Sequence, residues 1–166
     1  MLAACRRSFV LRTSWVVGSH GNNFAKTMLR LAAERDSLGV VADQFGAPTS
    51  AELLADWTAH LLHRALRGTG DPHYGLYHAV ASGATSWYAY ACHVIERARA
   101  AGAVVRVPPG GVKAIATADY SVVARRPANS RLDNAKLQAA FGLHAPSWQD
   151  GVDHVLDRLL PTKAKT

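Results

Sequence analysis

The sequence predicts an α/β fold, because segments with the pattern of β-strands alternate along the chain with segments that have the pattern of α-helices. The first strand-like segment is apolar almost throughout, as expected for a parallel sheet that is covered on both faces. With 166 residues, 49% of them hydrophobic and 19% charged, the chain has the size and composition of one globular domain. We expect residues 1–160 to form this domain and residues 161–166 to form a flexible tail.

The first half of the chain contains two predicted strands with a helix between them. Residues 8–17 predict a near-continuous strand buried on both faces, and residues 38–43 predict a short one. Residues 22–37 have helical periodicity, and either Asn22 or Asn23 can cap the first turn. The apolar face of this helix comprises Phe24, Met28, Leu31 and Ala32.

A longer helix is predicted over residues 47–68. Pro48 marks its entry, Thr49 and Glu52 have the spacing of a capping box, and Gly68 marks its end. These signals predict where the helix begins and ends.

The second half of the chain continues the alternation. We expect a strand over residues 75–82 and a helix over residues 85–102, with Thr85 or Ser86 as the N-cap. An apolar run at residues 103–107 leads into a segment rich in proline and glycine, which we expect to be irregular.

Two further helices close the predicted domain. They span residues 132–142 and 145–160, and the second begins with Ser147 and Asp150 at capping-box spacing.

The charge pattern favours a small anionic ligand over nucleic acid or a membrane. The net charge is +7 and the pI is about 9.9, but the basic residues are scattered. They are not interleaved with aromatic residues, as they are in proteins that bind single strands. No apolar run approaches the roughly 18 residues of a membrane span. We therefore expect no nucleic-acid or membrane partner.

The two cysteines, Cys5 and Cys92, have neither a metal-binding spacing nor the pattern of a secreted disulfide framework. This usage is typical of a reducing compartment, and we expect a cytoplasmic protein.

The sequence contains no motif of a self-sufficient catalytic centre. It has no Gly-x-Gly-x-x-Gly, no Tyr-x-x-x-Lys, no Gly-x-Ser-x-Gly and no P-loop. His60 and His63 lie one helical turn apart, but no third zinc ligand accompanies them, so surface or packing roles are favoured.

Six motifs in series nevertheless resemble the dTDP-4-dehydrorhamnose reductase family of extended short-chain dehydrogenases. They are "VLRTSWV", "GNNFAKTMLRLAAER", "VVADQFGAPTSAELLAD", "GLYHAVASGATSWYAYA", "ARRPANSRLDNAKLQAAFGL" and "PSWQDGVDHVL". The resemblance implies the C-terminal portion of a Rossmann-like fold with its sugar-nucleotide-binding subdomain. By this resemblance we expect the family's N-terminal half, which binds the cofactor, to be absent from this chain.

The activity that the family implies is reduction of dTDP-4-dehydro-rhamnose by NADPH (or NADH) to dTDP-L-rhamnose, a precursor of bacterial surface polysaccharides such as O antigen. The motifs that bind the cofactor and transfer the proton belong to the absent half, so we expect this chain to be inactive alone. The alternative is a non-catalytic module that binds the dTDP-sugar, or that docks on an intact reductase.

The resemblance also implies a set of substrate-binding residues. Trp15 matches a tryptophan that packs against the sugar; the residues alone favour a core role for it, and the resemblance favours the substrate role. Asn23 and Phe24 open a helix whose N–H groups can face a diphosphate, with ordinary capping as the alternative. Arg125 and Arg126 could clamp the diphosphate or could be a solvated pair.

Gln44 completes this predicted set. Together with Gly46, Pro48 and Thr49 it matches the family's cleft-shaping "DQFGAPT" loop, although the loop could equally reflect turn chemistry alone.

The resemblance to some family members also implies a homodimer in which Mg²⁺ bridges the two subunits. Glu52 matches one of the carboxylates that bind Mg²⁺, but the matching C-terminal position here is Arg158. Because Glu52 also completes the predicted capping box, its metal role is the less favoured alternative.

Overall fold

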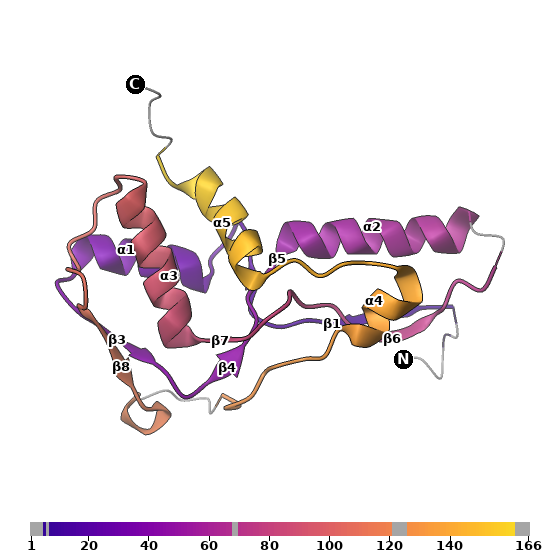
Figure 1. Ribbon diagram of the computed structural model, residues 1–166, viewed down its shortest axis with the longest axis horizontal. Coiled ribbons are helices and arrows are strands. Elements are labelled where there is room, and N and C mark those ends of the chain that lie inside the picture. The colour runs from indigo at the N-terminus through magenta and orange to yellow at the C-terminus, as the bar shows by residue number, and fades with distance from the viewer. Residues whose placement is uncertain (1–4, 6, 68–69, 121–125, 162–166) are drawn as a thin grey trace.

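The computed structural model describes residues 5, 7–67, 70–120 and 126–161. Figure 1 shows an elongated molecule, with α1, α3, β3 and β8 towards one end and α2, α4, β1 and β6 towards the other. The helical elements are α1 (Phe24–Glu34), α2 (Ala51–Arg67), α3 (Trp87–Ala100), the 3-10 turn η1 (Thr117–Asp119), α4 (Ala135–Phe141) and α5 (Trp148–Leu159). The strands are β1 (Phe9–Arg12), β2 (Val16–Val17), β3 (Leu38–Val41), β4 (Phe45–Gly46), β5 (Thr49–Ser50), β6 (Gly75–His78), β7 (Thr85–Ser86) and β8 (Val112–Ile115).

Most strand pairs are parallel, which confirms the predicted α/β class. β1 pairs with β6, β2 with β5 and β3 with β8, all in parallel, whereas β4 and β7 are antiparallel. Among the described residues these are four separate two-stranded sheets. Parallel pairing needs long crossovers, and here the helices supply them.

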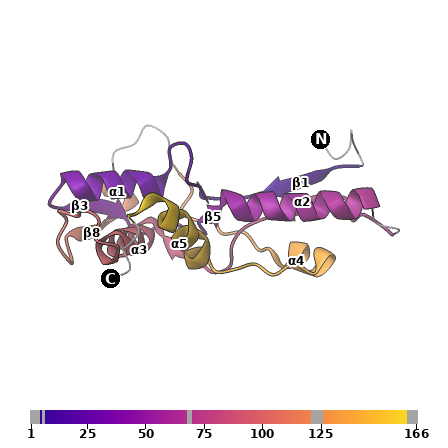
Figure 2. The same cartoon turned by 90° about the horizontal axis from the view of Figure 1, so that it is seen from above.

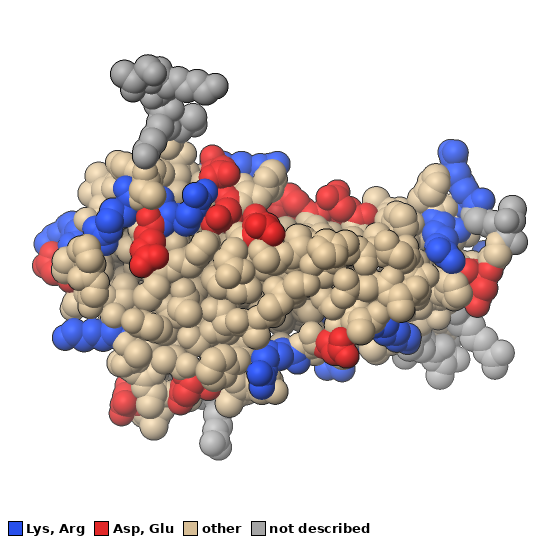
Figure 3. Space-filling view, in the orientation of Figure 1, with Lys and Arg blue, Asp and Glu red and all other residues tan. Residues whose placement is uncertain are grey.

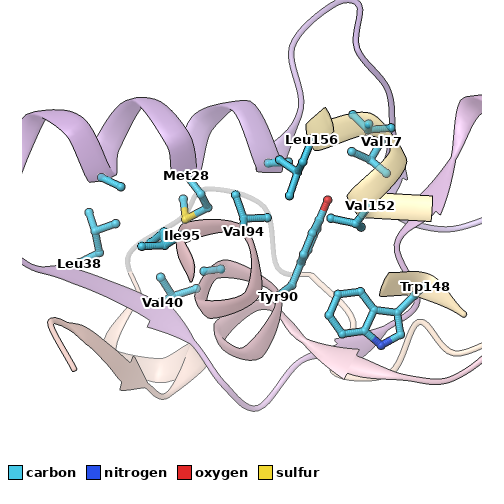
Figure 4. Packing of buried hydrophobic residues seen from close by; sticks show 14 of the residues in the cluster. Val17, Met28, Leu38, Val40, Tyr90, Val94, Ile95, Trp148, Val152 and Leu156 are labelled. Carbon is cyan, nitrogen blue, oxygen red and sulfur yellow. The ribbon is translucent and has the colours of Figure 1, made fainter. Parts of the chain in front are cut away.

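The core has two parts. One is packed between α1, α3, α5 and β3, and Figure 4 shows Met28, Tyr90 and Val152 within it. The other lies between α2, β6 and α4, around Trp57 and Phe141. Figure 2 shows the same separation from above. Leu53 packs against both parts, so the start of α2 joins the two ends of the molecule.

The prediction of one continuous first strand, buried on both faces, is wrong. The chain breaks between β1 and β2 at Trp15, whose φ is 49°. This left-handed backbone turns the chain so that Val16 and Val17 can pair with β5. β1 itself is only half-buried, with Arg12 exposed.

The capping box predicted at the start of α2 is also wrong. The Ser50 hydroxyl accepts the Leu53 N–H at 3.2 Å, so Ser50 caps the helix. The Thr49 hydroxyl is used elsewhere, because it donates to the Ala47 carbonyl and accepts the Ala81 N–H. Gly68, the predicted end of the helix, lies outside the described residues.

The other caps agree with the sequence. Asn23 caps α1 by accepting from the Lys26 N–H, and Ser86 caps α3 by accepting from the Ala89 N–H. Ser147 and Asp150 form the expected capping box at α5.

The segment after residue 107 is not irregular throughout, as we expected. It contains β8, whose Val112 lies opposite Leu38 of β3. Pairing with a distant strand overrides the local proline and glycine signals. No helix in the described part of the chain is long and apolar enough to cross a membrane. Residues 162–166 of the predicted tail lie outside the description.

Candidate functional site

A cleft of about 300 Å³ opens beside α1 and α3, at the end of the molecule that holds the first part of the core. Among the described residues its wall is mainly aromatic, with one charged side chain. The lining residues are Trp15, Val16, Phe24, Thr27, Trp87, Tyr90 and Arg126. The cleft thus unites three of the six predicted substrate-binding residues: Trp15, Phe24 and Arg126.

Trp15 is held rigidly in this cleft. Its indole stacks on Trp87 with ring centroids 3.6 Å apart and an interplanar angle of 15°. A Cβ built on Gly46 would lie 2.5 Å from Trp15 Cε2 and 2.9 Å from both neighbouring ring atoms, so Gly46 lies against an indole face. Two parallel rings at 3.6 Å leave no room between them, and Gly46 must therefore cover the face opposite Trp87.

Trp87 and Tyr90 are lining residues that the sequence did not single out. Trp87 is the first residue of α3, and Phe24 packs beside it with ring centroids 4.6 Å apart. Phe24 also contacts Tyr90, at 5.1 Å between centroids. In the sequence, Trp87 and Tyr90 follow a helix cap in the "TSWYAYA" motif and lie one helical turn apart. This spacing is the signal from which their shared position could have been predicted.

The Tyr90 hydroxyl is buried and has no hydrogen-bond partner among the described residues. Burial raises the pKa of this phenol, so it stays protonated at physiological pH. Figure 4 shows the ring between Val94 and Trp148, with its oxygen directed towards Val17 and Leu156. Tyr90 therefore contributes its ring to the cleft and places its hydroxyl in apolar surroundings.

Asn23 is used for capping, the alternative that the sequence left open. Its Oδ1 accepts from the Lys26 N–H at 3.1 Å, and its Nδ2 donates to the Gly18 carbonyl at 2.7 Å. The side chain does not line the cleft. It fixes the start of α1, and this places Phe24 and Thr27 in the wall.

Arg126 is the charged residue among the described residues that line the cleft. It is exposed, and a guanidinium presents N–H donors in a planar fork that suits the oxygens of an anion. Arg125, the other half of the predicted clamp, lies outside the described residues.

Gln44 is buried and does not line the cleft. Its amide donates to the Thr117 hydroxyl at 3.1 Å. The neighbouring Asp43 accepts from both the Thr117 N–H and the Thr117 hydroxyl. These hydrogen bonds lower the pKa of the Asp43 carboxyl, so it is ionised at neutral pH.

Glu52, the predicted metal ligand, has a cationic neighbour. Arg158 Nη1 lies 3.4 Å from Glu52 Oε1, so the residue at the matched C-terminal position pairs with Glu52 directly. In the described part of the chain, no three His, Cys, Asp or Glu residues come together to hold a metal. The magnesium role of Glu52 remains a prediction without support from this geometry.

The distribution of Lys and Arg on the molecular surface bears on whether the ligand is a nucleic acid. Figure 3 shows Lys and Arg in separate groups at both ends and along the lower edge of the visible face, around a broad uncharged area. On the described part of this face, the basic residues do not line up as a continuous groove of the kind that binds a nucleic-acid backbone. A second hollow, of about 310 Å³, lies between β1 and α2 and is lined mainly by apolar side chains.

Comparison with known proteins identifies the family. The family model described as the RmlD substrate binding domain matches residues 1–160. The chain belongs to this family. It is 52% identical over 160 residues to dTDP-4-dehydrorhamnose reductase of Escherichia coli K12, covering 96% of this chain and 52% of the relative.

Solved structures of the RmlD family share the fold. The Bacillus anthracis dTDP-4-dehydrorhamnose reductase, in complex with NADP, has a TM-score of 0.77 at 34% identity and matches 90% of this chain and 48% of that one. The Clostridium acetobutylicum reductase has a TM-score of 0.81 at 30% identity and matches 95% and 50% of the two chains. The chain thus spans about half the length of the relatives that it matches.

The residues present do not fit a nicotinamide dinucleotide. Such a cofactor needs a glycine-rich turn from a strand into a helix. The glycine-rich segment "GTGDPHYG" has the opposite order, because it lies between the end of α2 and the start of β6. We therefore assign no step of a hydride transfer to the residues that the structure describes.

Proposed function

We propose that this chain is the sugar-nucleotide-binding part of a dTDP-4-dehydrorhamnose reductase, and that the cleft between Trp15 and Arg126 holds the dTDP-sugar. The observation that supports this is the combination, in one cleft, of an aromatic wall and an arginine. These are the two groups that a sugar diphosphate needs. The C–H faces of a deoxysugar pack on aromatic rings, and a guanidinium binds diphosphate oxygens bidentately.

The packing of Trp15 refines this proposal. Both indole faces are covered, by Trp87 and by Gly46, so the sugar contacts the Trp15–Trp87 pair as one preformed surface. A rigid aromatic wall loses little conformational freedom when the ligand binds. Phe24 and Thr27 of α1 form the adjacent wall. The Thr27 hydroxyl donates to the Asn23 carbonyl at 3.0 Å, and its oxygen can still accept a hydrogen bond.

Reduction of the bound sugar requires NADPH, and we assign that cofactor to the part of the relatives that this chain does not span. The chain alone would then bind the substrate without turning it over, and we propose that it does so in the cytoplasm. A second candidate is a non-catalytic module that pairs with another copy or with an intact reductase. The half-length coverage supports it equally.

Isothermal titration of the purified chain tests the proposal. We expect dTDP and dTDP-L-rhamnose to bind, and Trp15→Ala to weaken binding by about tenfold, the equivalent of ~1.4 kcal/mol. Leu66→Ala is the matched control, because Leu66 is a large exposed side chain that is remote from this cleft. Equal affinity of wild type and Trp15→Ala for both ligands would contradict the proposal. In the same preparation we expect no oxidation of NADPH.

A further inference from the structure

Most polar side-chain groups in the wall of the cleft are hydrogen-bond donors. The indoles of Trp15 and Trp87 and the guanidinium of Arg126 can donate a hydrogen bond but cannot accept one. The hydroxyl of Tyr90 is fully buried, so a ligand in the cleft does not reach it. Among the described lining residues, the hydroxyl of Thr27 is therefore the side-chain group that can accept a hydrogen bond from a ligand.

The proton of the Thr27 hydroxyl is already in use. The hydroxyl donates to the Asn23 carbonyl at 3.0 Å, one helical turn back, and the same carbonyl accepts the Thr27 N–H at 3.1 Å. This hydrogen bond selects one of the two rotamers that threonine adopts in a helix, so the oxygen has a fixed place in the wall. Thr27 is half-buried, and no donor among the described residues pairs with its oxygen. The remaining lone pairs can therefore only accept, and they are left for a ligand.

Thr27 lies beside the aromatic part of the wall. It follows Phe24 by three residues in α1, so the two side chains are neighbours on the helix surface. The Phe24 ring in turn lies 4.6 Å from the Trp87 ring, between centroids, and Trp87 stacks on Trp15. A sugar ring that packs its C–H face on these aromatic rings directs hydroxyl groups outward from its edge. The acceptor on Thr27 is thus next to the surface on which such a sugar would lie.

We infer that Thr27 is a specificity-determining residue of the cleft, whose hydroxyl oxygen accepts a hydrogen bond from a hydroxyl group of the sugar. This inference deepens the proposed function and rests on it. The oxygens of a diphosphate only accept hydrogen bonds, so they suit Arg126 and not Thr27. The ligand therefore has one direction in the cleft, with its diphosphate towards Arg126 and a sugar hydroxyl towards the first turn of α1. The cleft should accordingly distinguish a dTDP-sugar from dTDP itself.

Titration calorimetry of the full chain with dTDP-L-rhamnose and dTDP tests the inference. Thr27→Val nearly keeps the shape of the side chain and removes the hydroxyl, while the Asn23 carbonyl still accepts the N–H of residue 27. We expect this change to weaken binding of dTDP-L-rhamnose about fivefold, the scale of one net hydrogen bond. It should leave the affinity for dTDP unchanged, because dTDP lacks the rhamnose. Thr27→Ser keeps the hydroxyl and should keep the preference of wild type for dTDP-L-rhamnose.

Thr58→Val is the matched control. The Thr58 hydroxyl also donates to a carbonyl one helical turn back, that of Leu54 at 2.6 Å, but Thr58 lines the separate hollow beside α2 and not the cleft. An equal loss for dTDP and dTDP-L-rhamnose in Thr27→Val would overturn the inference, because it would indicate general loosening of the wall. Equal affinity of wild type for the two ligands would also overturn it, and so would a loss in Thr27→Ser as large as in Thr27→Val. If wild type binds neither ligand, the proposed function itself fails, and this outcome differs from all three.

Discussion

Gly46 lies so close to the face of the Trp15 indole that a Cβ there would come within 2.5 Å of Cε2. Glycine is needed at this position for lack of space and not for backbone conformation, because Gly46 does not have a positive φ. The positive φ belongs to Trp15, at 49°. A tryptophan in this region of backbone space carries strain, which the stack on Trp87 and the contact with Gly46 must hold in place.

Gly46→Ala should therefore displace Trp15 and damage the cleft. We expect the free energy of unfolding to fall by about 1–3 kcal/mol, the usual cost of overpacking, and dTDP affinity to fall with it. Urea denaturation and calorimetric titration measure the two effects. Gly39→Ala is the control, since its added Cβ would meet nothing closer than 3.4 Å. Unchanged binding by Gly46→Ala would contradict the fixed placement of Trp15.

Trp87→Ala should remove one side of the stacked pair. Because two parallel indoles at this distance couple optically, we expect a band in the circular dichroism spectrum of wild type that is lost in Trp87→Ala. It should be lost equally in Trp15→Ala, and retained when the more distant Trp57 of α2 is changed to Phe. Affinity for dTDP-L-rhamnose should fall about fivefold to tenfold in Trp87→Ala, since a preformed aromatic surface is lost. A spectrum that does not change in Trp87→Ala would show that the rings are not stacked in solution.

Features that depend on contacts within a few residues could be predicted from the sequence. The starts of α1, α3 and α5 are of this kind, because Asn23, Ser86 and Ser147 cap these helices through contacts within a few residues. The break at Trp15 is not, since nothing local to an apolar run signals a tryptophan with positive φ. Thr49 was misjudged because its hydroxyl serves Ala81, 32 residues away.

The same distinction applies to the site. Trp15, Phe24 and Arg126 were predicted from the family resemblance, and the structure brings them to one cleft. Trp87 was missed, since its role depends on a stack with a residue 72 positions away along the numbering (87 − 15). Contacts of this range follow from tertiary packing and have no periodic signature in the sequence.

Tyr90→Phe should stabilise the protein. Removing a buried hydroxyl that has no partner removes its desolvation cost, and we expect the free energy of unfolding to rise by ~1 kcal/mol. Tyr77→Phe provides the matched comparison, since the Tyr77 hydroxyl donates to the His73 carbonyl and its loss should destabilise by a similar amount. Thermal and urea unfolding of both variants decide the matter. Destabilisation by Tyr90→Phe would show that its hydroxyl has a partner in solution.

The Asp43–Thr117 contact should make stability depend on pH in the acid range. In the folded protein the pKa of the Asp43 carboxyl is lowered from its ordinary value of 3.8. As the pH falls, this carboxyl therefore takes up its proton in the unfolded chain before it does so in the folded protein. The stabilisation is therefore complete above about pH 5, and it is lost as pH falls below 3.8 through the folded-state pKa. The difference in unfolding free energy between wild type and Asp43→Asn should shrink over this window. A difference that stays constant into acid would contradict the assignment.

Arg158 and Glu52 allow the predicted magnesium role to be tested directly. Arg158 Nη1 lies 3.4 Å from Glu52 Oε1, so the Glu52 carboxylate is already paired with a guanidinium. We therefore expect Mg²⁺ to leave the melting temperature of wild type unchanged. Arg158→Glu should destabilise the protein, because it places two like charges together beside a partly buried carboxylate. Two neighbouring carboxylates are the ligands that Mg²⁺ prefers, so added Mg²⁺ should recover part of that loss. Arg158→Gln, which removes the charge without adding a ligand, should not respond to the metal. A higher melting temperature of wild type in Mg²⁺ would instead show that the metal competes successfully with the arginine.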